Sequence, residues 1–237
     1  MARASIAVLF LGLCVAPTAA DEILSAKTLA ATKLATVFLK TEAKGIIVSG
    51  SGFVVKKDGD VALIVTNLHV VAPKLKIDIE PDRTLPRPPR VVGKIRPRII
   101  RPAVPTSPAP RTVVLTLKDA VVTAVFGSGT ADERSARTEI VAVDPENDLA
   151  ILKVTGVKNL PAPIVFEKST ELIETTTVYA FGFPFGSLLS TNKGSPAITV
   201  GKAAISSLRT NDQGELAIVQ IDGSLNPGNS GGPIVDT

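Results

Sequence analysis

Three side chains in this sequence could together carry out nucleophilic chemistry: His69, Asp148 and Ser230. His69 is the only histidine, and an imidazole is the side chain best suited to general-base catalysis near neutral pH. It lies near the end of the apolar run VALIVTNLHVV, where a strand gives way to a loop, which is a usual position for functional residues. A single histidine is more often a structural residue, so its role depends on its partners.

Two acids compete for the position beside His69. Asp144 and Asp148 stand at either end of the turn in DPENDLAILKV, and either could be an ordinary turn residue. Asp148 leads directly into an apolar strand, where a carboxylate needs a hydrogen-bond donor to stay charged, and a histidine ring N–H is a suitable one. We therefore predict that Asp148 is buried and hydrogen-bonded to His69.

The third group lies in the glycine-rich loop NPGNSGGP. Glycines 228, 231 and 232 permit a tight turn and let backbone N–H groups approach a reacting atom. The amides of Gly228 and Ser230 could then stabilise an oxyanion. The order His, Asp, Ser predicts acyl transfer, in which His69 removes the proton of Ser230 and the hydroxyl attacks a carbonyl group.

The elements that would position these residues are mostly strands. Hydrophobic residues make up 45% of the chain, Trp is absent and Tyr179 is the only tyrosine, so the core is aliphatic and rich in β-branched residues. Asp58-Gly59 predicts a hairpin, and a short helix is expected around residues 25–36. The pattern predicts an all-β sandwich or pair of barrels. Strands are expected within 35–42, 49–60, 61–71, 75–80, 111–117, 120–127, 138–154, 176–186, 197–208, 216–223 and 232–236.

The N-terminus is typical of a secretory signal peptide over residues 1–20. Arg3 precedes an apolar stretch from Ile6 to Ala16, and small residues follow, with cleavage expected after Ala20. That stretch is shorter than the roughly 20 residues of a membrane-spanning helix, although an uncleaved anchor is the alternative. Removal of the signal would also remove Cys14, the only cysteine, and with it any disulfide or cysteine-type zinc site. We expect an exported protein, periplasmic or secreted.

The positive charge of the chain is concentrated in residues 81–111. This segment holds nine prolines, eight Lys or Arg residues and one acid, whereas the rest of the chain is slightly acidic. Such a density of proline excludes regular strands, so we expect an inserted loop. It is either a solvated spacer or a docking arm for an anionic surface or partner. Scarce aromatic residues and the localised charge argue against nucleic-acid binding.

The motifs GSGFVV, TNLHVV, DPENDLAILKV, YAFGFPFG and NPGNSGGP, in this order, resemble the trypsin-like serine proteases of the chymotrypsin fold, in particular the bacterial HtrA/Deg family. The resemblance covers residues 50–74 and 139–237. It implies two β-barrels, an N-terminal one over 21–157 that contains the inserted loop and a C-terminal one over 158–237.

The same resemblance implies the roles of individual residues. His69 would be the general base, Asp148 its orienting acid and Ser230 the nucleophile. Gly228 and Ser230 would supply the oxyanion N–H groups and Asn229 would shape their turn, with no cofactor or metal. Residues Ser224 and Leu225 would line the substrate pocket. Since neither is acidic, we expect small or medium aliphatic residues before the cleaved bond. Family members act in protein quality control on unfolded polypeptides, and many form homo-oligomers.

Two features depart from the family pattern. The 81–111 insertion lengthens the interval between His69 and Asp148, which a surface loop tolerates. The sequence also stops at Thr237, before the last strands of the second barrel and the PDZ module that are usual in the family. We therefore expect an incomplete second barrel and weak or no activity from these 237 residues alone. The alternative function is a non-catalytic protease-fold protein that docks through the basic loop.

Overall fold

The computed structural model describes residues 23–43, 45–72, 74–77, 111–114, 120–166, 172–190 and 194–236. For 74–77 and 111–114 the description is limited to the backbone. The predicted signal peptide and nearly all of the predicted insertion lie outside these residues. No helix in the described ranges is both long and apolar enough to cross a membrane.

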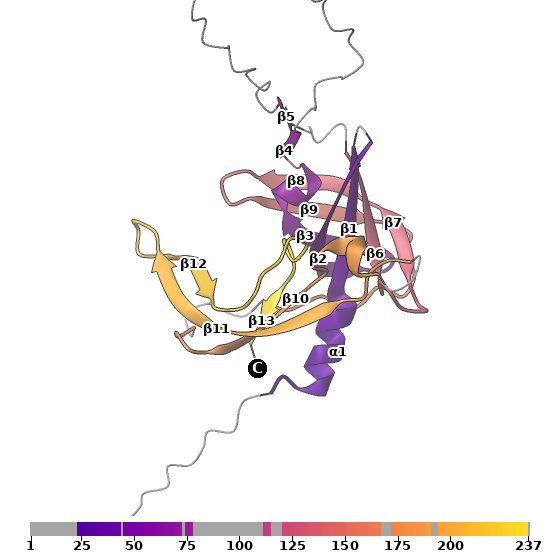
Figure 1. The fold of residues 1–237 in the computed structure, drawn as a ribbon. Coiled ribbons are helices and arrows are strands. Elements are labelled where there is room, and N and C mark those ends of the chain that lie inside the picture. The colour runs from indigo at the N-terminus through magenta and orange to yellow at the C-terminus, as the bar shows by residue number, and fades with distance from the viewer. Residues whose placement is uncertain are drawn as a thin grey trace, which may run out of the picture.

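The larger sheet has seven antiparallel strands in the order β7-β6-β1-β2-β3-β9-β8. Its edge strands β7 and β8 are consecutive in the chain with only Thr138 between them, so the sheet curls round until its two edges approach each other (Figure 1). The strands are β1 (Thr36–Ala43), β2 (Ile46–Asp58), β3 (Val61–Asn67), β6 (Val121–Phe126), β7 (Arg134–Arg137), β8 (Glu139–Asp144) and β9 (Leu149–Val154).

The inner face of this sheet is the main hydrophobic core. Buried residues alternate with more exposed ones along β3 and β9, as expected for strands with one face turned inward. The cluster is almost entirely aliphatic. Its members are Val37, Leu39, Val54, Ala62, Ile64, Val70, Val71, Val122, Ala124, Phe126, Ala150, Leu152, Val154, Val157 and Leu160.

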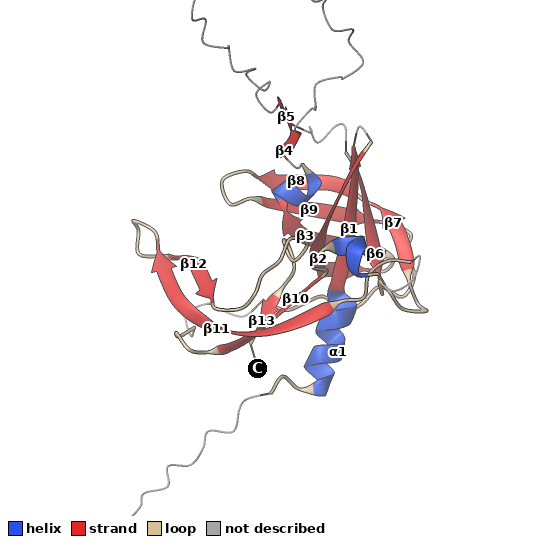
Figure 2. Cartoon of the chain, in the orientation of Figure 1, coloured by secondary structure: helices blue, strands red, loops and turns tan. Residues whose placement is uncertain are grey.

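The second sheet has four strands in the order β12-β11-β10-β13 and stays open (Figure 2). They are β10 (Thr177–Gly182), β11 (Thr199–Thr210), β12 (Leu216–Ile221) and β13 (Ile234–Val235). Most side chains of β11 and β12 are partly or fully exposed. The two sheets meet where Phe38 of β1 packs against Phe183, just beyond β10, with ring centroids 5.3 Å apart.

The predicted all-β class is confirmed, with a curled first sheet and an open second one. The expected helix is α1 (Ala26–Ala35), whose N-cap Ser25 accepts a hydrogen bond at Oγ from the Thr28 amide. The Asp58-Gly59 hairpin is also present, because Asp58 pairs with Val61 across a tight turn.

Three sequence-based predictions need correction. Residues Leu68–Val71, which we expected at the end of a strand, form the short helix α2. Strand β7, with its two arginines, gives no apolar signal and was not predicted. The inserted segment ends one residue earlier than expected, because Arg111 begins β5 (Arg111–Val114), which pairs with β4 (Lys74–Ile77).

Candidate active site

His69 projects from α2, the single helical turn that follows β3. The turn buries Val70 and Val71 in the core and leaves the His69 side chain outside, 53% exposed. The hydroxyl of Thr41 in β1 donates to the Val70 carbonyl oxygen at 2.8 Å, which fastens the turn to the sheet. The histidine is therefore an accessible side chain on a well-anchored backbone.

The structure brings His69 and Asp148 together. The ring Nδ1 of His69 lies 2.5 Å from Oδ2 of Asp148, and the backbone N–H of His69 donates to Oδ1 at 2.9 Å. Because the carboxylate can only accept, Nδ1 carries the proton and Nε2 is left to act as a base. This pairing is the one expected from the sequence.

The backbone of Asp148 is held as firmly as its side chain. Its carbonyl oxygen accepts hydrogen bonds from the Leu68 amide at 2.9 Å and from Asn67 Nδ2 at 3.0 Å. Asp148 adopts a left-handed conformation with φ 54°, which is uncommon outside glycine but tolerated by aspartate. Two hydrogen bonds to its backbone and two to its side chain thus hold Asp148 against α2 and the end of β3.

The prediction that Asp148 is buried is wrong, because its side chain is 45% exposed. Asp148 is the last residue of the turn rather than the first residue inside the strand. Leu149 after it is still 41% exposed, and burial begins only at Ala150. The hydrogen bonds to His69, rather than a buried environment, therefore account for the position of the carboxylate.

Asp144 takes the competing role of turn residue. Its side chain accepts hydrogen bonds from the amides of Glu146 and Asn147 and from Asn147 Nδ2. The Asn147 side-chain amide is the main cause of the lowered pKa of Asp144, and the two backbone N–H groups add to it. The two acids at the ends of the turn are thus distinguished by their partners.

The loop that carries Ser230, residues 226–233 and here called the serine loop, reaches the first sheet at β2. The Ser51 amide donates to the Ser230 carbonyl oxygen at 2.8 Å. A Cβ atom placed on neighbouring Gly50 would lie 2.7 Å from methyl groups of Val70 and 3.3 Å from that same Ser230 carbonyl oxygen. Gly50 thus lies between the residue that follows His69 and the backbone of Ser230, which places α2 and the serine loop against the same point of β2.

Two glycines of the loop occupy conformations that other residues rarely adopt. Gly228 has φ 103° and Gly231 has φ 81°. A side chain at Gly231 would collide with the Ser51 carbonyl oxygen and the Thr66 hydroxyl. Glycine is therefore required here both for its backbone angle and for the close approach of the loop to the first sheet.

The peptide groups of this loop are anchored through their carbonyl oxygens. Pro227 O accepts from the Phe185 amide at 2.6 Å and Asn229 O accepts from the Gly232 amide at 2.9 Å. In a trans peptide the N–H points away from the C=O, so these bonds turn the N–H groups of Gly228 and Ser230 the opposite way. Within the described residues neither N–H has a hydrogen-bond partner.

The amide between these two is turned inward. The N–H of Asn229 donates to the Asn226 carbonyl oxygen at 3.0 Å, so it is not available to a ligand. The N–H groups of Gly228 and Ser230, which have no partner among the described residues, therefore lie on either side of a peptide group that faces the protein. Such preorganised donors can stabilise a developing negative charge.

The Ser230 hydroxyl completes the predicted set, but no hydrogen bond joins it to the His69 ring among the described residues. Hydrogen bonds between catalytic groups are often long or misaligned without substrate and shorten in the complex. The structure thus brings together His69 with Asp148, and the elements that carry His69 and Ser230, but no hydrogen bond among the described residues joins the side chains of His69 and Ser230.

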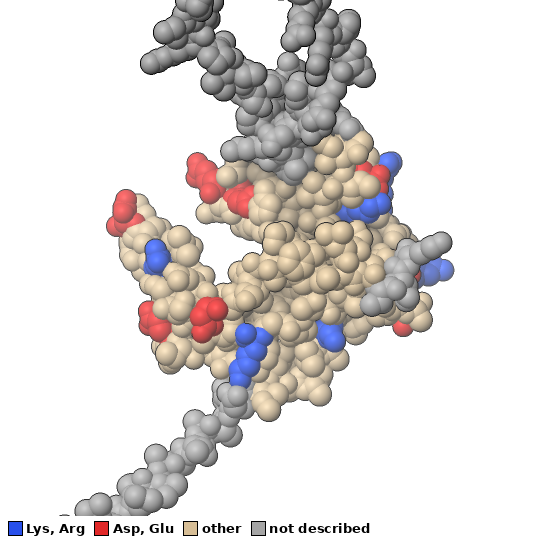
Figure 3. Space-filling view, in the orientation of Figure 1, with Lys and Arg blue, Asp and Glu red and all other residues tan. Residues whose placement is uncertain are grey.

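The residues predicted to line a substrate pocket are exposed. Ser224 and Leu225 lie between β12 and the serine loop, and Leu225 is 55% exposed. Figure 3 shows open space between the arm formed by β11 and β12 and the first sheet. Leu225 is nonetheless an apolar side chain that a peptide could cover.

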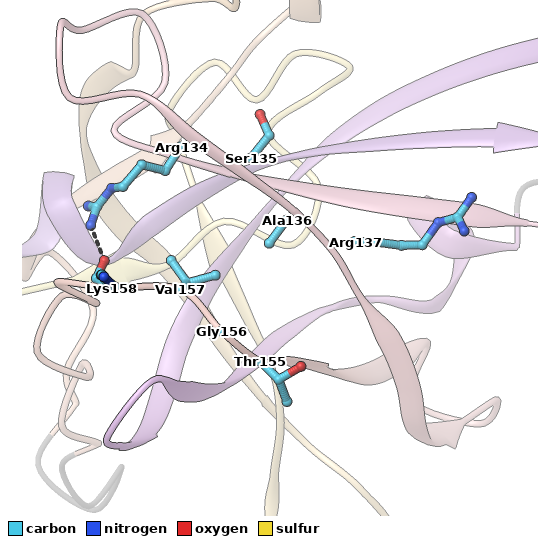
Figure 4. A pocket seen from close by; sticks show the side chains of 8 residues that line it. All are labelled: Arg134, Ser135, Ala136, Arg137, Thr155, Gly156, Val157 and Lys158. Carbon is cyan, nitrogen blue, oxygen red and sulfur yellow. Dashed lines mark hydrogen bonds between the residues drawn. The ribbon is translucent and has the colours of Figure 1, made fainter.

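A separate pocket of about 480 Å³ lies between β7 and the segment after β9. It is lined by residues 134–137 and 155–158, and none of the predicted site residues belongs to it. Arg134 spans one side of it by donating to the carbonyl oxygens of Lys158 and Asn159, while Arg137 points away from that contact (Figure 4).

Two supporting residues, Ser51 and Asn67, were not singled out from the sequence. Ser51 lies within the motif GSGFVV and Asn67 within TNLHVV. Both are polar side chains within, or at the end of, an apolar strand. Such a side chain needs a hydrogen-bond partner, and this need was the signal by which the two residues could have been found. Among the described residues, no group of three or more His, Cys, Asp or Glu side chains could hold a metal ion.

Comparison with known proteins identifies the family. Residues 50–237 match the model of the trypsin-like peptidase domain. Protease Do-like 1, chloroplastic, from Arabidopsis thaliana is 34% identical over 107 residues, covering 45% of this chain and 24% of that protein. Serine protease HTRA1B from Danio rerio is 28% identical over 190 residues, covering 80% of this chain and 28% of that protein.

Solved structures agree on the fold. A crystal structure of Deg5 has a TM-score of 0.54 and 23% identity, and the match covers 88% of this chain and 77% of that one. The HtrA-type protease AlgW with tripeptide also has a TM-score of 0.54, with 49% of its chain covered. The present chain spans only 24% and 28% of the two curated relatives named above.

The curled β-sheet, the paired His69 and Asp148 and the glycine-rich serine loop thus occur in a chain whose family model spans residues 50–237. The predicted resemblance is confirmed: this chain belongs to the trypsin-like peptidase family, and its relatives there are HtrA/Deg serine proteases.

Proposed function

We propose that this protein is a serine endopeptidase in which Ser230 is the nucleophile, His69 the general base and Asp148 the acid that orients it. The observation that carries the proposal is the 2.5 Å contact between His69 Nδ1 and Asp148 Oδ2. It assigns a proton to Nδ1, so that in the neutral ring Nε2 is the unprotonated nitrogen, as a base must be.

The reaction follows the acyl-enzyme route. Nε2 of His69 accepts the Ser230 proton while Oγ bonds to the carbonyl carbon of a peptide, and the N–H groups of Gly228 and Ser230 stabilise the oxyanion. Collapse of the intermediate breaks the C–N bond, and the proton on Nε2 passes to the departing amine. Water then hydrolyses the acyl ester by the same steps and releases the carboxylic acid product.

The substrate class follows from the loop before Ser230. We propose that Ser224 and Leu225 contact the residue before the cleaved bond and favour small or medium aliphatic side chains, since neither carries a negative charge to pair with Lys or Arg. Unfolded polypeptides are the proposed substrates, as in protein quality control. Peptide substrates with valine should therefore be cleaved faster than matched peptides with arginine, and the reverse preference would reject this assignment.

We further propose an exported protein with a signal peptide over 1–20 and two units, 21–157 and 158–237, that assembles as a homo-oligomer. The two sheets fall on either side of the 157/158 boundary, which supports the division. Relatives include proteins named as periplasmic and as chloroplastic, which supports location in a compartment reached by targeting. N-terminal sequencing of the secreted protein would test the cleavage site.

Labelling with a fluorophosphonate probe tests the catalytic assignment in the full-length protein. We expect covalent labelling that Ser230→Ala abolishes and that Ser206→Ala, a change at an exposed serine of β11, leaves intact. No labelling of the folded protein would favour the alternative, a non-catalytic protein that binds through residues 81–111. The observation that favours this alternative is that, among the described residues, no hydrogen bond joins the His69 ring to the Ser230 hydroxyl.

A further inference from the structure

Ser51 is a fully buried serine in β2, with 0% of its surface exposed. Its hydroxyl donates to the Gly228 carbonyl oxygen at 2.7 Å and accepts from the Phe183 amide at 3.1 Å. Its own amide donates to the Ser230 carbonyl oxygen at 2.8 Å. A single residue of the first sheet therefore contacts the serine loop at two places and the end of β10 at a third.

The direction of these hydrogen bonds is fixed by their partners. A carbonyl oxygen can only accept and an amide N–H can only donate, so the Ser51 hydroxyl proton must point at Gly228. The Ser51 carbonyl oxygen is also occupied, since it accepts from the Thr66 hydroxyl at 2.7 Å. The N–H, hydroxyl and carbonyl groups of Ser51 are thus all hydrogen-bonded in the protein interior.

The consequence concerns the peptide group between Gly228 and Asn229. Its carbonyl oxygen is held by Ser51 Oγ and its N–H by the Asn226 carbonyl oxygen. Rotation of this peptide would break both bonds. The torsions that would change, ψ of Gly228 and φ of Asn229, also set the orientation of this peptide relative to the adjoining ones, which carry the N–H groups of Gly228 and Ser230.

Glycine makes such rotation easy, because residue 228 has no side chain to restrict its backbone. The conformation with φ 103° therefore has to be stabilised by contacts outside the residue itself. Ser51 supplies the contact at the Gly228 carbonyl oxygen, and it does so from the same strand that lies against α2, the helix of His69.

We propose that Ser51 is a positioning residue. Its hydroxyl holds the Gly228–Asn229 peptide in one orientation, and in that orientation the N–H groups of Gly228 and Ser230 on either side face the substrate. This inference rests on the proposed function and deepens it. Ser51 does not touch the reacting atoms; it acts through the serine loop, and it links the geometry of the oxyanion site to the sheet that carries the histidine.

The test compares Ser51→Ala with Ser128→Ala in the full-length protein. Ser128 is a matched control because it is also buried and its hydroxyl also donates to a backbone carbonyl oxygen, that of Pro196, at 2.6 Å. Both variants lose one buried hydroxyl–carbonyl bond, but only the bond of Ser51 reaches the serine loop; Ser51→Ala also removes the acceptor of the Phe183 amide. Fluorophosphonate labelling rates, kcat and KM for a valine peptide, and amide exchange over residues 226–232 would be measured.

We expect Ser51→Ala to lower kcat and the labelling rate by roughly ten- to hundredfold with KM little changed, since small displacements at a reacting centre have effects of this size. The Asn229 amide should exchange faster, because its peptide group is no longer held at both ends. Ser128→Ala should retain wild-type kcat and wild-type exchange in this loop.

The outcomes separate the two proposals. Wild-type labelling that Ser51→Ala leaves unchanged would overturn the positioning role alone. A raised KM with unchanged kcat, or an equal loss of kcat in Ser128→Ala, would overturn it as well. A folded wild-type protein that is not labelled at Ser230 would instead reject the proposed function.

Discussion

Replacing Asp148 by Asn is the most direct perturbation of the proposed mechanism. The asparagine keeps both hydrogen bonds that the backbone carbonyl oxygen of residue 148 accepts, from the Leu68 amide and the Asn67 side chain, so the turn stays in place. It keeps only one of the two side-chain oxygens. If that oxygen still accepts from the His69 amide, the new NH₂ group faces Nδ1.

The expected size of the effect follows from the tautomer. An NH₂ group opposite Nδ1 makes that nitrogen an acceptor, so the ring proton moves to Nε2, which can then no longer accept the Ser230 proton. The same change in another serine protease lowers kcat by roughly 10⁴-fold, or about 5 kcal/mol in activation free energy. Stability should fall by about 1 kcal/mol at most, because a half-exposed hydrogen-bonded pair contributes little.

The assay measures kcat for a valine peptide and the free energy of unfolding in urea. Asp144→Asn is the matched control, since it makes the same chemical change at the other end of the same turn, where the partners are Glu146 and Asn147. We expect the control to retain most of its kcat. The assignment would be refuted if Asp148→Asn kept more than about a tenth of wild-type kcat while folded, or if both variants lost activity equally.

Three further predictions follow from the fold. Leu152→Ala, at a fully buried position of β9, should lower the free energy of unfolding measured in urea by about 2–5 kcal/mol. Leu149→Ala is the control, because Leu149 is 41% exposed in the same strand, and it should change this free energy by less than about 1 kcal/mol. Gly231→Ala should abolish labelling of Ser230, since its Cβ would meet the Ser51 carbonyl oxygen at φ 81°; a normal labelling rate would contradict this geometry. Asn147→Ala should raise the pKa of Asp144 towards its ordinary value in an NMR titration. Because the pKa of Asp144 is lowered in the folded state, the ionised carboxylate stabilises the fold above the unfolded-state pKa, and this stabilisation disappears as pH falls through the folded-state pKa. The difference in free energy of unfolding between wild type and Asn147→Ala should therefore shrink in acid. A difference that does not depend on pH would contradict this prediction.

The strands that carry the site could be predicted because their burial follows a simple period. Alternating or continuous apolar residues locate β3 and β9, and with them the positions of His69 and Asp148 along the chain. Strand β7 could not be found this way. Its sequence RSAR has no apolar face, and its pairing with β6 depends on the curl of the whole sheet rather than on local preference.

The local conformation at the site was less accessible to prediction than its residue identities. Val70 and Val71 have strong strand preferences, yet LHVV forms a helical turn because these two side chains must reach the core while the chain leaves the sheet. The exposure of Asp148 was likewise missed, since a pattern of letters does not say at which residue a turn ends. Tertiary contacts decided both cases.

The serine loop illustrates why some of the site lies beyond sequence reasoning. Its glycines predict a tight turn, but not which way each peptide group faces. That orientation is set by distant residues: Phe185 holds Pro227, and Ser51 holds Gly228. These contacts join β2 of the first sheet and the end of β10 in the second to one short loop.

If the proposed mechanism is correct, the oxyanion site requires both sheets to be correctly packed, so a destabilised interface between the two should lower activity before the protein unfolds. Phe38→Ala, which removes the ring packed on Phe183 but no group of the proposed machinery, should therefore reduce the labelling rate of protein that circular dichroism still reports as folded. Labelling that declines only in step with unfolding would show instead that the loop keeps its geometry independently of the sheet interface.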